Sequence, residues 1–114
     1  MLTGERALSA TDVEARPWRP FAGQPGVRDK VLWEDPATGS YAGMMEIEPG
    51  ATVRTHGHRR AVHHLFVVRG SCELAVTERV LGPGAYTFVP AATKHGIESA
   101  GTEGCTLFFL YLRP

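Results

Sequence analysis

The sequence predicts an all-β domain, folded as a barrel or jelly roll. Two observations support this prediction. Glycine and proline, 13 and 8 in number, are spread along the 114 residues. They interrupt the chain roughly every 8–12 residues, a rhythm typical of short strands joined by turns. Between the interruptions apolar and polar residues alternate, as they do in a strand with one buried face. The length corresponds to one domain, and no internal repeat divides it.

The first 26 residues are expected to form an arm outside the barrel. The stretch SATDVE could cap one short helical turn, because Thr11 is followed three residues later by Glu14. The next stretch, RPWRPFAGQPG, contains three prolines and cannot continue a helix. We therefore expect residues 1–26 to run extended and to pack Trp18 and Phe21 on a barrel made of residues 27–114.

Strand signals begin at Val27 and continue to the end of the chain. GVRDKVLWED predicts a strand as far as Trp33, and DPATG predicts the turn that follows it. SYAGMMEIE alternates and predicts a strand with one face turned inward. AVHHLFVVRG is almost continuously apolar, which is typical of a strand in the core. Further strands are predicted for TVRTHGH, SCELAVTERVL, AYTFVP, KHGIESA and GCTLFFLYL.

The charge balance limits the classes of partner. Twelve basic and twelve acidic residues give a formal net charge of zero. This argues against nucleic acid or an anionic membrane as a partner held by bulk charge, and it is compatible with a homodimer. The chain shows no apolar signal segment and no membrane span, so we expect a cytoplasmic protein. Cys72 and Cys105 are expected to be small buried residues rather than a disulfide.

Four of the five histidines crowd into nine residues of the stretch RTHGHRRAVHHLFVVRG. His56 and His58 are two apart and can share one face of a strand, about 7 Å from each other, a span that one metal ion can bridge. His63 and His64 are adjacent and face opposite ways, so only one can join that pair. We assign His63 to the pair and His64 to the outer sheet face or a subunit contact. On spacing alone, an ordinary structural role for these histidines stays open.

The spacing of the first histidine group resembles the first motif of the cupin family. Gly50 is followed after five residues by His56 and, two positions on, by His58. After four more residues comes His63, and after six more comes Gly70. The family has a glutamate where this chain has His63.

A second stretch is similar to the second cupin motif. Gly84 is followed after five residues by Pro90, with Ala92 two positions on. His95 follows after two residues and Ser99 after three more. Ala92 and Ser99 replace the glycine and the asparagine of the family pattern. The residue spacings of both stretches match those of the two cupin motifs, and together the stretches span residues 50–99.

The resemblance implies a cupin double-stranded β-helix with one divalent metal ion per chain, held by His56, His58, His63 and His95. Imidazole suits zinc, iron, nickel and copper, and we expect zinc, with iron or nickel as alternatives. Four neutral imidazoles leave the ion with a charge of +2, whereas a site with one carboxylate would carry +1. The more positive ion is the stronger Lewis acid.

A four-histidine site on a small cupin resembles that of the cupin-type aromatic polyketide cyclases, of which the resistomycin-pathway cyclase is an example. The resemblance implies an enzyme of secondary metabolism that takes a small-molecule substrate, stabilises an enolate and closes a ring by aldol chemistry. The strand pattern turns an apolar set inward to form the substrate pocket, although the same residues would serve as ordinary core: Tyr41, Met45, Leu65, Val67, Phe109 and Tyr111. Arg54 is a weaker candidate that could meet an anionic substrate.

Two other functions remain open at this stage. The spacing of His56, His58 and His63 is also similar to that of dihydroxyacetophenone-type cupin dioxygenases. These would use iron and cleave a β-diketone or a hydroxyacetophenone. The segment from Pro25 to His58 resembles the zinc-binding cupin module of anti-sigma factors, which would make this chain a sensor rather than an enzyme.

Overall fold

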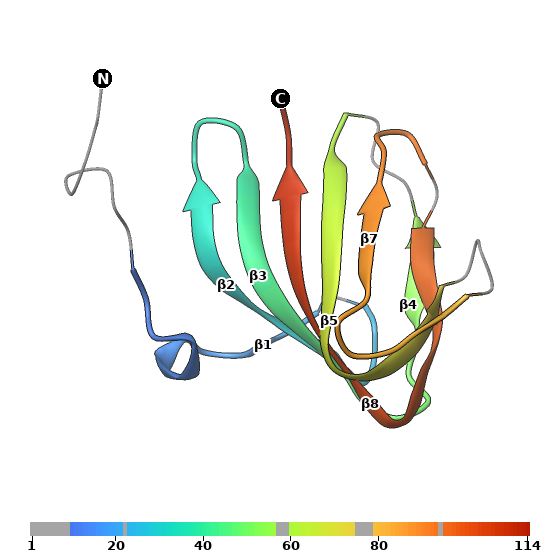
Figure 1. The fold of residues 1–114 in the computed structure, drawn as a ribbon. Coiled ribbons are helices and arrows are strands. Elements are labelled where there is room, and N and C mark those ends of the chain that lie inside the picture. The colour runs from blue at the N-terminus through green and yellow to red at the C-terminus, as the bar shows by residue number, and fades with distance from the viewer. Residues whose placement is uncertain (1–9, 22, 57–59, 75–78, 94) are drawn as a thin grey trace.

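The predicted all-β domain is confirmed. The structure is a computed structural model that describes residues 10–21, 23–56, 60–74, 79–93 and 95–114. Within these residues it contains one short 3-10 turn and no α-helix (Figure 1). The elements are η2 (Val13–Ala15), β1 (Arg19–Pro20), β2 (Val27–Asp35), β3 (Ser40–Ile47), β4 (Val53–His56), β5 (Val62–Leu74), β6 (Val80–Leu81), β7 (Tyr86–Val89) and β8 (His95–Leu112). No helix in this part of the chain is long and apolar enough to cross a membrane.

The strands form one antiparallel sheet that curls back on itself (Figure 1). The hydrogen-bonded order is β1-β2-β3-β8-β5-β6, with β4 paired to β8 and β7 paired to β5. β5 and β8 are the long strands, and both take part in the two halves of the curl. The start of β8 pairs with β4 and with the end of β5, whereas its last part, from Cys105 to Leu112, lies between β3 and the first half of β5. This crossing of two long strands produces the jelly roll.

Several strand boundaries differ from the expectation. KHGIESA and GCTLFFLYL were expected as separate strands, but residues 95–100 and 104–112 belong to the single strand β8, and Lys94 lies outside the described residues. Likewise β5 continues past Gly70 to Leu74, and β2 reaches Asp35 rather than Trp33. Glycines bend β5 and β8 without ending them. Gly104 has a φ of 75°, and a Cβ there would lie 2.5 Å from the carbonyl oxygen of Ile47.

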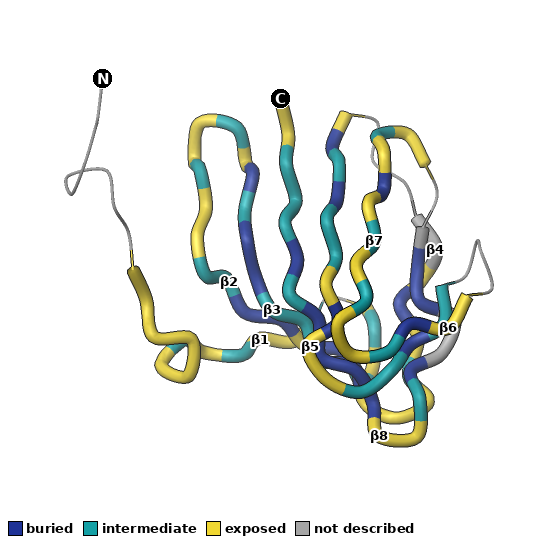
Figure 2. Tube along the Cα trace, in the orientation of Figure 1, coloured by how far each residue is buried: buried dark blue, intermediate teal, exposed yellow. Residues whose placement is uncertain are grey.

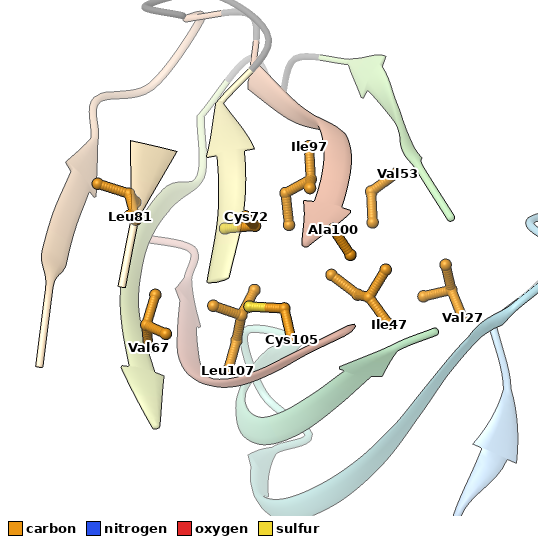
Figure 3. Close-up of a cluster of buried hydrophobic side chains, with 10 residues drawn as sticks. All are labelled: Val27, Ile47, Val53, Val67, Cys72, Leu81, Ile97, Ala100, Cys105 and Leu107. Carbon is orange, nitrogen blue, oxygen red and sulfur yellow. The ribbon is translucent and has the colours of Figure 1, made fainter. Parts of the chain in front are cut away.

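The apolar core lies where the two halves of the curl face each other. Ten buried side chains form one cluster (Figure 3): Val27, Ile47, Val53, Val67, Cys72, Leu81, Ile97, Ala100, Cys105 and Leu107. Both cysteines are free and buried, as the sequence predicts. Their thiols share a hydrogen bond that lowers the pKa of Cys72 and raises that of Cys105.

The helical turn at the start of the arm is capped differently from the expectation. The Asp12 carboxylate accepts a hydrogen bond of 3.1 Å from the backbone N–H of Glu14. Asp12, and not Thr11, is therefore the N-cap. The turn is a 3-10 turn of three residues that begins at Val13, so the carboxylate directly before it is the group within reach.

The arm then crosses the outer side of β2. The Trp18 ring lies 4.3 Å from Lys30 Nζ and 4.6 Å from Arg28 Cζ, as cation–π contacts do. Arg19 pairs with Asp29 through both the backbone register and the side chains. Phe21 packs against the core cluster. Both aromatic residues of the arm thus contact the barrel.

Candidate functional site

A cavity of about 500 Å³ opens inside the curl, between β3, β4, β5 and β8 and the end of the arm. Its wall is mostly apolar and aromatic, with a few polar groups. The lining residues are Phe21, Gln24, Tyr41, Met45, Val53, Arg54, His63, Leu65, Leu74, Gly96, Ile97, Leu107, Phe109 and Tyr111. Concave, largely apolar sites of this size with a few convergent polar groups are typical of small-molecule sites.

One side of the cavity is an aromatic wall built by strand register. Tyr41 and Tyr111 are Cα partners on β3 and β8, and their rings are 5.4 Å apart. Tyr41 also meets Phe109 edge-on at 5.3 Å, and the His63 ring lies 4.9 Å from that of Tyr111. Gly43 makes this packing possible, since a Cβ there would lie 2.8 Å from the Phe109 ring. The wall therefore presents two phenols and an imidazole in one row.

His63 is the predicted ligand whose side chain the structure describes. It lies on β5, it is 9% exposed, and it lines the cavity. Its neighbour His64 is on the opposite face of β5, where its ring stacks on Tyr86 and shares a hydrogen bond of 2.6 Å with the Tyr86 hydroxyl. The two adjacent histidines therefore lie on the sides that strand alternation assigns to them.

The remaining predicted ligands are placed only through the backbone, or not at all. Positions 56 and 95 are direct Cα partners on β4 and β8, although they are far apart in the sequence. His58 lies outside the described residues. Among the described side chains, no group of three or more His, Cys, Asp or Glu residues could hold a metal ion. The backbone register is compatible with the four-histidine set, and the set itself stays a prediction.

A bulge in β4 changes the relation between Arg54 and position 56. Val53 pairs with Ile97 and His56 with His95, so three steps along β4 match two steps along β8. The strict alternation that assigned Arg54 and His56 to one face is therefore interrupted between them. Arg54 lines the cavity, and its backbone N–H donates a hydrogen bond of 2.6 Å to Gln24 Oε1.

Five of the six predicted pocket residues line the cavity: Tyr41, Met45, Leu65, Phe109 and Tyr111. Val67 differs, because it is fully buried in the core cluster and is not part of the described lining. It pairs with Leu107 just before a bulge in β5. Whether the five contact a substrate stays a prediction.

The strand pattern did not predict the contribution of the arm to the cavity. Phe21 and Gln24 line it although they precede the first barrel strand. The only sequence signal was the aromatic residue of the arm, which indicated packing rather than a site. Phe21 N–H donates to the Val27 carbonyl, and Val27 N–H donates to the Gln24 carbonyl, so a tight turn holds this segment at the cavity.

The cavity wall contains one phenol with a perturbed acidity. Burial raises the pKa of Tyr41, and the negative charge of Asp29 raises it further. Arg19, the partner of Asp29, acts in the opposite direction. A phenol whose pKa is raised in this way is a neutral hydrogen-bond donor at neutral pH.

Comparison with known proteins gives the family. The family model described as the ChrR cupin-like domain matches residues 6–113. The chain belongs to the cupins of this ChrR-like type. Among curated proteins, none matches this cupin significantly.

Three solved structures share the fold of this cupin. The polyketide cyclase RemF from Streptomyces resistomycificus is 20% identical, with a TM-score of 0.79 over 94% of this chain and 82% of RemF. A putative acetylacetone dioxygenase from Methylibium petroleiphilum is also 20% identical, with a TM-score of 0.77 over 98% of this chain and 81% of that protein. The anti-sigma factor ChrR of Rhodobacter sphaeroides, solved in complex with SigE, is 22% identical, with a TM-score of 0.69. That match covers 87% of this chain and 50% of the matched chain. At this identity the likeness shows the fold, and the fold hosts enzymes as well as a regulatory protein.

Proposed function

We propose that this cupin is a metal-dependent enzyme of secondary metabolism that closes a ring on a polyketide substrate. In this proposal His56, His58, His63 and His95 hold one divalent ion, zinc. The observation that carries the proposal is the position of His63, buried in the wall of a cavity that is otherwise aromatic and apolar. A histidine placed to serve only the core would not need to face a space of about 500 Å³.

The side chains of the cavity suit such a substrate. When bound, the ion would supply Lewis acidity toward an enolate or carbonyl oxygen. The apolar wall would exclude water and hold a flexible chain in a folded shape, which removes part of the entropic cost of ring closure. Tyr41 would donate a hydrogen bond to a carbonyl oxygen, because its raised pKa keeps the phenol protonated. Arg54 at the cavity would favour an anionic group of the substrate.

The deciding experiment measures the metal and the need for oxygen together. Protein purified without added metal should contain zinc at one equivalent per chain, measured by plasma mass spectrometry. A synthetic linear poly-β-ketone should be cyclised at the same rate in air and under strict anaerobiosis. Iron in the protein together with stoichiometric O₂ uptake on a β-diketone would replace the cyclase with a dioxygenase. Zinc without turnover, together with binding to a sigma factor, would replace it with a sensor.

Adjacent histidines provide a matched pair of variants for the ligand set. His63→Ala should lower the metal content, because it removes a nitrogen from the cavity. His64→Ala should leave the metal content unchanged, because that ring lies on the other side of β5, against Tyr86. If His64→Ala empties the site and His63→Ala does not, the proposed ligand set must be abandoned.

A further inference from the structure

A side chain at the end of the arm is hydrogen-bonded to the cavity strand β4. The arm from residue 10 to Pro20 is mostly exposed (Figure 2), whereas Phe21 and Gln24 are half-buried and line the cavity. Gln24 Oε1 accepts a hydrogen bond of 2.6 Å from the backbone N–H of Arg54. A residue that precedes the barrel is thereby bound to the strand that carries His56, the first of the predicted ligands.

The pairing of β4 with the rest of the sheet is short and irregular. β4 has only four residues, and among the described strands it pairs with β8 alone. Its register contains a bulge, in which positions 54 and 55 lie opposite the single residue Gly96. A bulge disrupts the ladder and bends the strand, so the pairing with β8 does not by itself fix the backbone there. An additional contact in the bulge therefore has a direct influence on the path of the strand.

The backbone of Gln24 is held on both sides by a tight turn. Its N–H donates a hydrogen bond of 3.1 Å to the Phe21 carbonyl, and its carbonyl accepts one of 3.2 Å from the Val27 N–H. Val27 is a core residue, 5% exposed, and it begins β2. A path of hydrogen bonds thus leads from the core through Gln24 to the bulge of β4. The neutral amide makes this link without bringing a charge into the wall of an apolar cavity.

We propose that Gln24 is a positioning residue, which holds the bulged strand β4 where position 56 can join His63 and His95 around the metal ion. This inference rests on the proposed metal site. Gln24 is not one of the proposed ligands and acts through the backbone of Arg54. Position 56 lies two residues beyond the hydrogen-bonded amide and is the Cα partner of position 95. A shift of the strand at Arg54 is therefore carried to the ligand, and the loss of groups that orient metal ligands typically lowers metal affinity about 10–100-fold.

Zinc affinity and the exchange rate of the Arg54 amide hydrogen test this proposal together, on the full chain. Gln24→Met keeps the length of the side chain but removes the acceptor. It should weaken zinc binding about tenfold, measured by competition with a chromophoric chelator. In the metal-free protein the Arg54 amide should exchange faster, measured by nuclear magnetic resonance. The midpoint of urea unfolding of the metal-free protein should barely change, because this hydrogen bond is exposed to solvent.

Two further variants separate the hydrogen bond from a general effect of the arm. Gln24→Glu keeps an acceptor at the same distance along the side chain, so the Arg54 amide should stay protected and zinc should bind at least as tightly as in the wild type. Arg16→Met is the matched control elsewhere on the arm. Arg16 Nη2 donates a hydrogen bond of 3.1 Å to the Leu32 carbonyl on β2, so this variant also loses a contact between arm and barrel. Its zinc affinity and its Arg54 exchange rate should equal those of the wild type.

The outcomes distinguish this inference from the proposed metal site. If the wild type and Gln24→Met bind zinc equally well, the positioning role is overturned and the metal site stands. Weaker zinc binding in Gln24→Met without faster exchange of the Arg54 amide would also overturn the role. So would an equal loss of zinc affinity in Gln24→Met and Arg16→Met, because the arm would then act through general stability. A wild type that binds no divalent metal would overturn both the positioning role and the metal site.

Discussion

At the scale of single residues, Tyr41 links the cavity to the charged pair formed by Asp29 on the neighbouring strand β2 and Arg19 of the arm. Its ring lines the cavity and contacts Tyr111 and Phe109. Burial is the main cause of its raised pKa, and the charge of Asp29 adds to it. A phenol of this kind resists ionisation, so it can donate a hydrogen bond to an anionic oxygen without becoming an anion itself.

The titration of Tyr41 can be followed directly by ultraviolet absorbance near 295 nm, where tyrosinate absorbs. The chain has three tyrosines, and we expect one transition clearly above the ordinary pKa of 10.0. Tyr41→Phe should remove this late transition. The sign for stability follows from linkage. A pKa raised by folding adds stability that is lost as pH rises through the folded pKa, so Tyr41→Phe should also flatten the alkaline decline in the free energy of unfolding. A late transition that persists in Tyr41→Phe would contradict this assignment.

The sequence could predict the residues of the site only where the strands are regular. Between Val62 and Val67, β5 pairs with β8 without interruption, so alternation correctly separates His63 from His64. The same rule is interrupted at the bulge between Val53 and His56, because a bulge leaves no clear mark in the local sequence. Gln24 was missed for another reason: it reaches the cavity through a turn of the arm, and no periodicity signals such a contact.

At the scale of elements, the turn before β8 holds an alanine in the left-handed backbone conformation. Thr93 N–H donates to the Pro90 carbonyl at 3.3 Å, which closes a four-residue turn. Ala92, at the third position of this turn, has a φ of 62°. A type II turn requires a positive φ there and favours glycine. The alanine that replaces the glycine of the family pattern therefore keeps the turn and carries the strain.

Ala92→Gly should stabilise the protein by about 0.5–1 kcal/mol. The left-handed conformation costs an L-residue about 1–2 kcal/mol, and part of the gain is offset because glycine is more flexible in the unfolded chain. The measurement is urea unfolding with a chelator present, so that metal binding does not contribute. Ala91→Gly is the control in the same turn; Ala91 has no positive φ, and the change should destabilise by about 0.5–1 kcal/mol. Equal effects of the two substitutions would show that the turn is not strained at Ala92.

Glycine also explains why the number of strands could not be read from the sequence. Gly70 ends the predicted strand AVHHLFVVRG, yet β5 continues through it with a φ of 77°. A Cβ at Gly70 would collide with the carbonyl oxygen of Gly104 on β8. Here glycine marks a close approach of two bent strands rather than a turn. Only the three-dimensional pairing distinguishes these two uses.

At the scale of the whole molecule, an exposed arginine of the arm and a buried carboxylate of the barrel form an ion pair. Arg19 donates hydrogen bonds of 2.9 Å and 3.3 Å to the Asp29 carboxylate. The Asp29 side chain is 2% exposed, whereas that of Arg19 is 59% exposed. A buried carboxylate on a barrel strand thus depends on an arginine of the arm. The arm is therefore expected to matter for the stability of the entire domain.

Arg19→Ala should destabilise the fold by about 2 kcal/mol, since it leaves a buried carboxylate without its partner, while the exposure of Arg19 limits the cost. The control is Glu46→Gln, which breaks the Arg28–Glu46 pair at a carboxylate that is 33% exposed, and it should cost less than about 1 kcal/mol. The absorbance titration of Tyr41 is a second measurement on the same variants. Arg19 lowers the pKa of Tyr41, so its removal should move the late tyrosinate transition to still higher pH, whereas Glu46→Gln should not move it. Equal losses of stability in both variants, with no movement of that transition, would mean that the Arg19–Asp29 pair adds little to the attachment of the arm. The arm would then not be coupled to the cavity through Asp29.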